Sequence, residues 1–212
     1  MADIRQELID FARRMGSAGL NRGTAGNLSV RGNKTGHGFW ITPTGMDYDT
    51  LAPDDIVFVN KDGSSTGMRK PSTEWRFHHD LYLARPEAGA VLHAHSPFAT
   101  ALACLRREIP PFHYMIARFG GDTVRCADYA TFGTQQLSNN ALKAMDGRSA
   151  CLLANHGLLV FGRDLKQAFD HAVELETLCE QYVLALQVGT PVLLDAEEMQ
   201  TMQEKFRTYG QR

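Results

Sequence analysis

The residues of this chain with the clearest capacity for chemistry are three histidines that follow apolar segments. His93 and His95 stand two positions apart at the end of the apolar run 90–92, and His156 follows a second apolar run, 151–154. Because side chains alternate faces along a strand, the imidazoles of His93 and His95 are predicted to face the same way. With a third nitrogen from a different strand, they would leave one coordination position open, as in a catalytic zinc site.

The alternative for each histidine is an ordinary structural role, and the chain contains eight histidines. A lone histidine is more often a hydrogen-bonded core or surface residue than a ligand. A structural role is harder to assign to two imidazoles side by side in a low-dielectric environment, because each needs a partner and one metal ion satisfies both. The spacing of His93 and His95 therefore favours a metal ion.

Glu74 is a carboxylate that could act beside such a metal. Ser72 is predicted to be the N-cap of a helix that runs to about Arg85, which places Glu74 in the first turn. There it could merely complement the helix dipole, or it could serve as a general base next to a metal-polarised carbonyl. His78, four residues further along the same face, is expected to support the site or to pack rather than to bind the metal.

Three segments combine glycine or proline with small hydroxyl or amide residues: 20–30, 42–46 and 70–75. Each alone could be a plain turn. Backbone N–H groups in such loops, together with the positive end of a helix, also bind anions. Taken together, the three segments predict a phosphorylated ligand.

Composition limits the remaining possibilities. The chain has 212 residues, of which 43% are hydrophobic and 22% charged, and a formal net charge of -2. These values are ordinary for one globular domain over residues 1–212, and without a basic stripe neither nucleic acid nor a membrane is an expected partner. Four cysteines without CxxC spacing predict no disulfide framework. No stretch is long and apolar enough for a signal peptide or a membrane span, so a cytoplasmic protein is expected.

The apolar periodicity predicts an α/β layered fold. Helices are expected over residues 4–15, after Ser96, and over 165–186, and strands over 38–41, 90–95, 109–116 and 123–126. Strands mixed with helices in one domain are typical of layered packing.

Several motifs resemble the class II aldolase/adducin family in order and spacing: GTAGN at 23–27, ITPTG at 41–45, PSTEWRFH at 71–78, HAH at 93–95 and HG at 156–157. Segments 109–117, 129–134 and 204–210 resemble in particular the family's L-fuculose-1-phosphate aldolase branch. The resemblance covers nearly the whole chain. It implies a single domain of α/β/α layers with a central, mostly antiparallel sheet.

The resemblance also implies roles for individual residues. His93, His95 and His156 would hold Zn²⁺, with Mn²⁺ or Co²⁺ as other possible ions, and Glu74 would be both a ligand and a catalytic group. Tyr114 would be the second catalytic residue. The implied phosphate-binding residues are Thr24, Asn27, Thr44, Gly45, Ser72 and Thr73, and the implied aldehyde-end residues are Phe132, Phe206 and Tyr209. Tyr114 and Tyr209 would come from a neighbouring subunit of a homotetramer with active sites at the subunit interfaces.

The implied activity is that of a metal-dependent class II aldolase. It would cleave a ketose 1-phosphate, either L-fuculose 1-phosphate-like or a 5-deoxy- or 5-methylthioribulose 1-phosphate, to dihydroxyacetone phosphate and an aldehyde. One alternative is a sister metalloenzyme: a pentulose-phosphate 4-epimerase, a methylthioribulose-1-phosphate dehydratase or a sugar-acid-phosphate decarboxylase. Another is a non-catalytic adducin-like binding module, which the presence of Glu74 and all three histidines argues against.

Two departures from the family pattern bear on specificity. Thr73 stands where the nearest pattern has serine, a change that keeps the hydroxyl donor and adds a methyl group. Arg118 and Phe119 stand where that branch has small residues. If this segment reaches the mouth of the site, the aldehyde need not be lactaldehyde.

Overall fold

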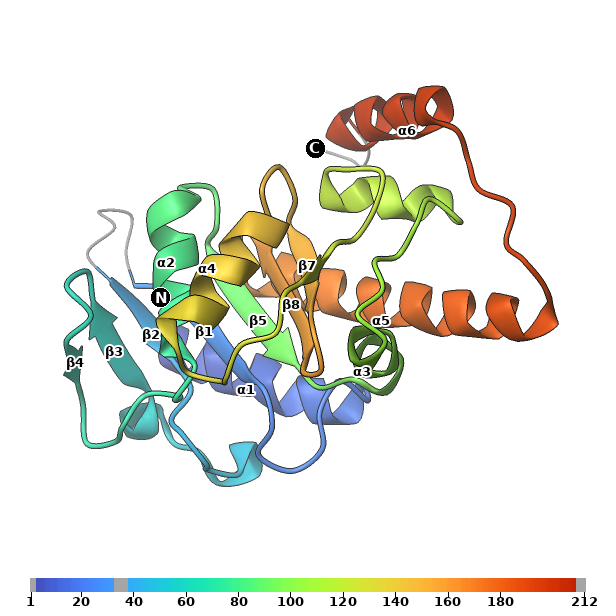
Figure 1. Ribbon diagram of the computed structural model, residues 1–212. Coiled ribbons are helices and arrows are strands. Elements are labelled where there is room, and N and C mark those ends of the chain that lie inside the picture. The colour runs from blue at the N-terminus through green and yellow to red at the C-terminus, as the bar shows by residue number, and fades with distance from the viewer. Residues whose placement is uncertain (1–2, 33–37, 209–212) are drawn as a thin grey trace.

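The protein is built around one eight-stranded sheet (Figure 1). The structure, a computed structural model, describes residues 3–32 and 38–208. The strand order is β4-β3-β2-β1-β5-β8-β7-β6, and every neighbouring pair is antiparallel except β6 and β7. The strands are β1 Asn27–Arg31, β2 Gly38–Ile41, β3 Val57–Asn60, β4 Ser65–Thr66, β5 Ala90–Ala94, β6 Cys126–Ala127, β7 Ala150–Leu153 and β8 Gly157–Gly162.

Helices cover both faces of this sheet, which confirms the predicted α/β/α layers. They are α1 Ile4–Ser17, α2 Trp75–Ala84, α3 Pro97–Cys104, α4 Gln135–Ala144, α5 Leu165–Val188 and α6 Ala196–Thr208, with short 3₁₀ helices η1 Tyr48–Thr50, η2 Pro53–Asp55 and η3 Tyr114–Phe119. One apolar core joins α1, α3 and α5 to the sheet, and a second joins α2 and α4 to its other face. Helix α6 packs against η3, away from the sheet (Figure 1).

The central strand β5 is buried on both faces, and this explains its apolar sequence. Leu92 packs with the core beneath α1 and α5, whereas Val91 packs with the core beneath α2 and α4. By alternation His93 points to the α2 side, where its ring meets the edge of Phe77 with 5.4 Å between ring centroids. The last residues of β5 therefore lie at one rim of the sheet.

The strand predicted over residues 109–116 is wrong. Ile109 forms only an isolated bridge to Val124, and the chain then turns into the 3₁₀ helix η3. Pro110 and Pro111 explain the difference, since proline has no N–H to donate to a sheet. In the segment expected over 123–126, Val124 forms only the isolated bridge to Ile109, and Cys126 begins β6 in the sheet.

The N-cap prediction at Ser72 is also wrong by two residues. Helix α2 begins at Trp75, and Glu74 occupies the N-cap position. Ser72 instead turns the chain ahead of the helix: its hydroxyl accepts the backbone N–H of Glu74 over 3.3 Å, and its carbonyl accepts that of Trp75 over 3.1 Å. The serine therefore orients Glu74 locally.

Two further features concern the whole chain. Cys104, Cys126, Cys151 and Cys179 are free thiols. Among the helices that the structure describes, none is long and apolar enough to span a bilayer.

Candidate functional site

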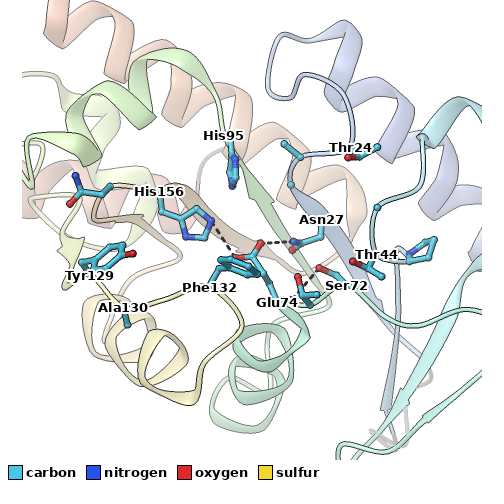
Figure 2. Close-up of a pocket in the computed structure, with 16 residues that line it drawn as sticks. Thr24, Asn27, Thr44, Ser72, Glu74, His95, Tyr129, Ala130, Phe132 and His156 are labelled. Atoms are coloured by element: carbon cyan, nitrogen blue, oxygen red, sulfur yellow. Dashed lines mark hydrogen bonds and ion pairs between the residues drawn. The ribbon is translucent and has the colours of Figure 1, made fainter.

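Glu74, His93, His95 and His156 meet at the rim of the sheet and form the histidine-glutamate cluster (Figure 2). Their potential ligand atoms all lie within 4.8 Å of one another. The Nε2 atoms of His93 and His95 are 2.9 Å apart. Glu74 places Oε2 3.3 Å from His93 Nε2 and Oε1 3.2 Å from His156 Nε2. The four predicted metal ligands therefore converge on one point.

Strand pairing explains why the cluster forms. Strand β5 pairs with β8, and Ala94 is opposite Leu158, so the turn that carries His156 lies beside the end of β5. On the other side β5 pairs with β1, where Asn27 is opposite His93. His93, the turn residue His156 and Asn27 therefore lie close together because β5, β8 and β1 are neighbours in the sheet.

The histidines have the protonation state that metal binding requires. His93 Nδ1 donates to the Leu158 carbonyl over 2.8 Å, which leaves the lone pair of Nε2 facing the cluster. Burial, together with the adjacent His95, lowers the pKa of His93 to about 3. Burial likewise lowers the pKa of His156 to about 3 and that of His95 below its ordinary value. All three imidazoles are therefore neutral at neutral pH.

The donor set fits a divalent cation. Glu74 Oε1 is buried and accepts no hydrogen bond. This oxygen and the lone pair on His93 Nε2 both face the centre of the histidine-glutamate cluster. Ligand atoms held about 2.0–2.1 Å from a tetrahedral ion lie about 3.4 Å from each other, close to the observed separations around Glu74. Three neutral imidazoles and one carboxylate are ligands that zinc and related ions prefer.

Residues outside the sequence motifs hold the cluster in place. Asn21 accepts the backbone N–H of His95 over 3.2 Å. Asn155, directly before His156, has a φ of 54°, a left-handed conformation that asparagine tolerates better than most residues. Arg106 Nε donates to the Asn155 side chain over 2.9 Å and so fixes the turn. In the sequence, Asn21 lies in the noted segment 20–30 and Asn155 precedes His156, but no local pattern connects Asn21 or Arg106 with the cluster.

A cavity of about 320 Å³ opens beside the cluster. It is lined by all six predicted phosphate-binding residues and by Phe132, together with Tyr129, Ala130 and Asn155, which sequence reasoning did not assign to the site. Figure 2 shows Thr24, Asn27, Thr44 and Ser72 on one side and Tyr129 and Ala130 on the other, with Glu74 and His95 between them. The cavity therefore has a polar wall and an aromatic wall.

The polar wall forms because two of the predicted loops pair with each other. Ser72 N–H donates to the Thr42 carbonyl and Thr44 N–H to the Lys70 carbonyl, each over 3.1 Å. The first loop joins them where β1 begins at Asn27. Hydroxyl, amide and backbone N–H groups converging in this way are suited to an anion.

Tyr114 and Phe206, two of the predicted site residues, lie away from the cavity. Tyr114 in η3 and Phe206 in α6 stack on each other with 6.4 Å between ring centroids, and neither lines the cavity. Tyr114 remains 47% exposed. Tyr209 lies outside the described residues. Within one chain, Tyr114 is therefore not brought to Glu74.

Gly26 offers a sharp test of the polar wall. Its φ is 77°, and a Cβ there would lie 2.7 Å from the carbonyl oxygen of His93 and 2.4 Å from the Asn21 amide nitrogen. Gly26→Ala is expected to lower the free energy of unfolding by more than the roughly 1–2 kcal/mol of a left-handed alanine, since backbone must also move. Gly23→Ala is the control, because Gly23 has a φ of 62° with no atom near its Cβ position. Urea unfolding of both variants measures the difference, and equal losses would contradict the close packing.

Comparison with known proteins places this architecture in a family. The family described as "Class II Aldolase and Adducin N-terminal domain" matches residues 6–183. The 5-methylthioribulose-1-phosphate/5-deoxyribulose-1-phosphate aldolase of Rhodospirillum rubrum is 56% identical over 207 residues, which cover 98% of this chain and 92% of the relative. The L-fuculose phosphate aldolase of Escherichia coli is 44% identical over 210 residues, 99% of this chain and 96% of the relative.

Among solved structures, an L-fuculose 1-phosphate aldolase superposes with a TM-score of 0.93 at 44% sequence identity. The superposition covers 98% of this chain and 97% of the other. The similarity thus extends over the sheet, both helical layers and the C-terminal segment.

Proposed function

The chain belongs to the class II aldolase and adducin family, and on that premise we propose that it is a metal-dependent aldolase acting on a ketose 1-phosphate. It cleaves the substrate to dihydroxyacetone phosphate and an aldehyde. The observation that carries this proposal is the opening of the histidine-glutamate cluster onto the polar wall of the cavity. A phosphate on that wall leaves the neighbouring carbons of the same substrate beside Glu74.

The substrate we favour is 5-methylthioribulose 1-phosphate or 5-deoxyribulose 1-phosphate. The Rhodospirillum rubrum relative with that name is 56% identical, against 44% for the L-fuculose phosphate aldolase of Escherichia coli. Tyr129 and Phe132 give the same cavity an aromatic lining, which suits an apolar C5 end. L-Fuculose 1-phosphate is the second candidate.

Zn²⁺ is the ion we assign to the cluster, with Mn²⁺ or Co²⁺ as alternatives that histidine ligands also accept. His93, His95 and His156 would hold it, with Glu74 as a fourth ligand before substrate binds. When bound, the ion supplies Lewis-acid polarisation of the substrate's ketone oxygen.

The chain's own side chains bind the substrate and move the protons. Thr24, Asn27, Thr44, Gly45, Ser72 and Thr73 bind the phosphate and so hold the C3–C4 bond at the cluster. As that bond breaks, its electron pair stays on C3. The C4 hydroxyl gives its proton to the Tyr114 oxygen while the phenol proton of Tyr114 passes to solvent, which leaves the aldehyde. Glu74, a carboxylate at the start of the reaction, takes up a proton from solvent and delivers it to C3 of the three-carbon fragment, completing dihydroxyacetone phosphate.

The mechanism needs Tyr114 from a second subunit, because one chain does not bring it to the cavity. We propose a homotetramer in which Tyr114, Phe206 and Tyr209 of one subunit complete the aldehyde end of the next, beside Phe132. The exposed ring of Tyr114, which stacks on Phe206 outside the cavity, supports this arrangement. A single domain over residues 1–212 and a cytoplasmic location complete the proposal.

Mixing two inactive variants tests the shared site. Glu74→Gln and Tyr114→Phe are each expected to lose most activity, but dissociation and reassembly of an equal mixture should restore activity at about one site in four. Those sites combine Glu74 of one subunit with Tyr114 of its neighbour. Turnover of the mixture, compared with each variant reassembled alone, gives the answer. No gain, in oligomers shown by mass spectrometry to be mixed, would place both residues in one chain's site.

The activity itself is tested by coupled detection of dihydroxyacetone phosphate released from a panel of ketose 1-phosphates. We expect release from the 5-methylthio and 5-deoxy substrates, its abolition by chelation, and its return with Zn²⁺. Metal-loaded protein that releases none would contradict the aldolase proposal. Formation of an epimer, a dehydrated product or CO₂ in the same reactions would instead identify one of the sister activities.

A further inference from the structure

A line of buried hydrogen bonds runs from Glu74 away from the cavity, between β1 and α2. Asn27 Nδ2 donates to Glu74 Oε2 over 3.0 Å, and Asn27 Oδ1 contacts His78 Nε2. On the far side of that imidazole, His78 Nδ1 bonds to Ser29 Oγ over 2.7 Å, and Ser29 Oγ bonds to the Tyr82 hydroxyl over 2.9 Å. All five side chains are buried, and His78 and Ser29 have no exposed surface.

The periodicities of the two elements produce this alignment. Asn27 and Ser29 are two apart on β1 and share one face of the strand. Glu74, His78 and Tyr82 are spaced by four along α2 and its N-cap, which places them on one stripe of the helix. The stripe faces the strand, so each polar group has a partner on the other element.

The chemistry of the end groups determines which atom donates and which accepts in each of these hydrogen bonds. A carboxylate only accepts, so Asn27 presents its NH₂ group to Glu74 and its carbonyl to His78. Because that carbonyl also only accepts, His78 carries its proton on Nε2 and a lone pair on Nδ1. Ser29 therefore donates to Nδ1 and accepts from Tyr82. The ring is neutral, in agreement with burial, which holds the pKa of His78 well below its ordinary value.

We propose that His78 is a positioning residue for Glu74, acting through the Asn27 amide. Its Nε2–H fixes the amide so that one N–H meets Glu74 Oε2 and the carboxylate is held among the histidines. The inference rests on the proposed function, in which Glu74 transfers the proton at C3. Without this donor the amide can turn, and its carbonyl would then face the carboxylate as a second acceptor, which leaves both without a hydrogen bond.

Two substitutions of His78 separate this role from packing. His78→Leu removes the donor, whereas His78→Gln places a terminal NH₂ where it can donate to Asn27. We expect His78→Leu to lower kcat for dihydroxyacetone phosphate release by about 10- to 100-fold, as for other residues that orient a metal-site group. KM should change less than kcat, metal content should stay at the wild-type level, and His78→Gln should regain most of the lost kcat.

His79→Leu is the matched control. His79 is the next residue on α2 and bonds to Asp80 and the Lys61 carbonyl, outside this line of hydrogen bonds. Its kcat should equal that of the wild type. If His78→Leu keeps the wild-type kcat per folded, metal-loaded site, or if His78→Gln falls as far as His78→Leu, the positioning role is overturned.

Nitrogen-15 NMR tests the same inference without turnover. The wild type should show His78 neutral with its proton on Nε2. The side-chain amide resonances of Asn27 should shift in His78→Leu and return in His78→Gln. If the wild type cleaves no ketose 1-phosphate, the proposed function fails, and these resonances still decide the positioning of Asn27. A proton on Nδ1, or Asn27 resonances that do not respond to His78→Leu, would overturn the inference.

Discussion

Replacing Glu74 by glutamine is expected to lower kcat by about 10²- to 10⁴-fold, the range typical of a lost general acid-base group. The substitution keeps the size of the side chain and an oxygen that can still accept from Asn27. It removes the ability to take up and deliver a proton at neutral pH. Because three imidazoles remain to hold the ion, metal content should stay near that of the wild type.

Metal analysis and kcat measured on the same preparation distinguish the two roles of Glu74. Loss of the metal in Glu74→Gln would make the carboxylate chiefly a ligand, and an unchanged kcat would remove it from the chemistry. Glu87→Gln is a suitable control, because Glu87 is an exposed residue that pairs only with Arg85 in the described part of the chain. Its kcat and metal content should both match the wild type.

The sequence predicted that His93 and His95 face the same way because strand geometry links the spacing of residues directly to the direction of their side chains. Residues two positions apart on a strand share one face. The Nε2 atoms of His93 and His95 accordingly lie 2.9 Å from each other. The apolar run before His93 became strand β5 and the run before His156 became strand β7, with β8 between them in the sheet. Both strands are buried on both faces, as continuous apolar runs predict. Local rules were sufficient wherever the residues concerned lie on one regular element.

The residues that local rules missed act across long stretches of the chain. Asn21 meets His95 from 74 positions away, and Arg106 meets Asn155 from 49. No periodicity connects such pairs, because the contact exists only after the sheet has formed. The failed strand over 109–116 has a different cause: its apolar residues suited a strand, but two consecutive prolines prevented pairing.

Replacing His95 by alanine is expected to remove both the metal and nearly all activity. Polarisation of the ketone oxygen by an ion accounts for several kcal/mol of transition-state stabilisation, and each 1.36 kcal/mol is a factor of ten in rate, so the loss should be about 10³-fold or more. His95 is the most exposed of the three histidines, whereas His93 is completely buried. Truncating His95 therefore deletes a ligand and leaves little cavity in the core.

Thermal unfolding separates the loss of the ligand from damage to the fold. In chelator, His95→Ala and the wild type should unfold at nearly the same temperature, since the substituted side chain is not part of the apolar core. Added Zn²⁺ should raise the Tm of the wild type, because an ion that binds only the folded state stabilises it by mass action, and should leave that of His95→Ala unchanged. His79→Ala, a histidine substitution on α2 outside the cluster, should respond to Zn²⁺ as the wild type does. A His95→Ala protein that is metal-free and fully active would exclude a metal-dependent reaction at this site.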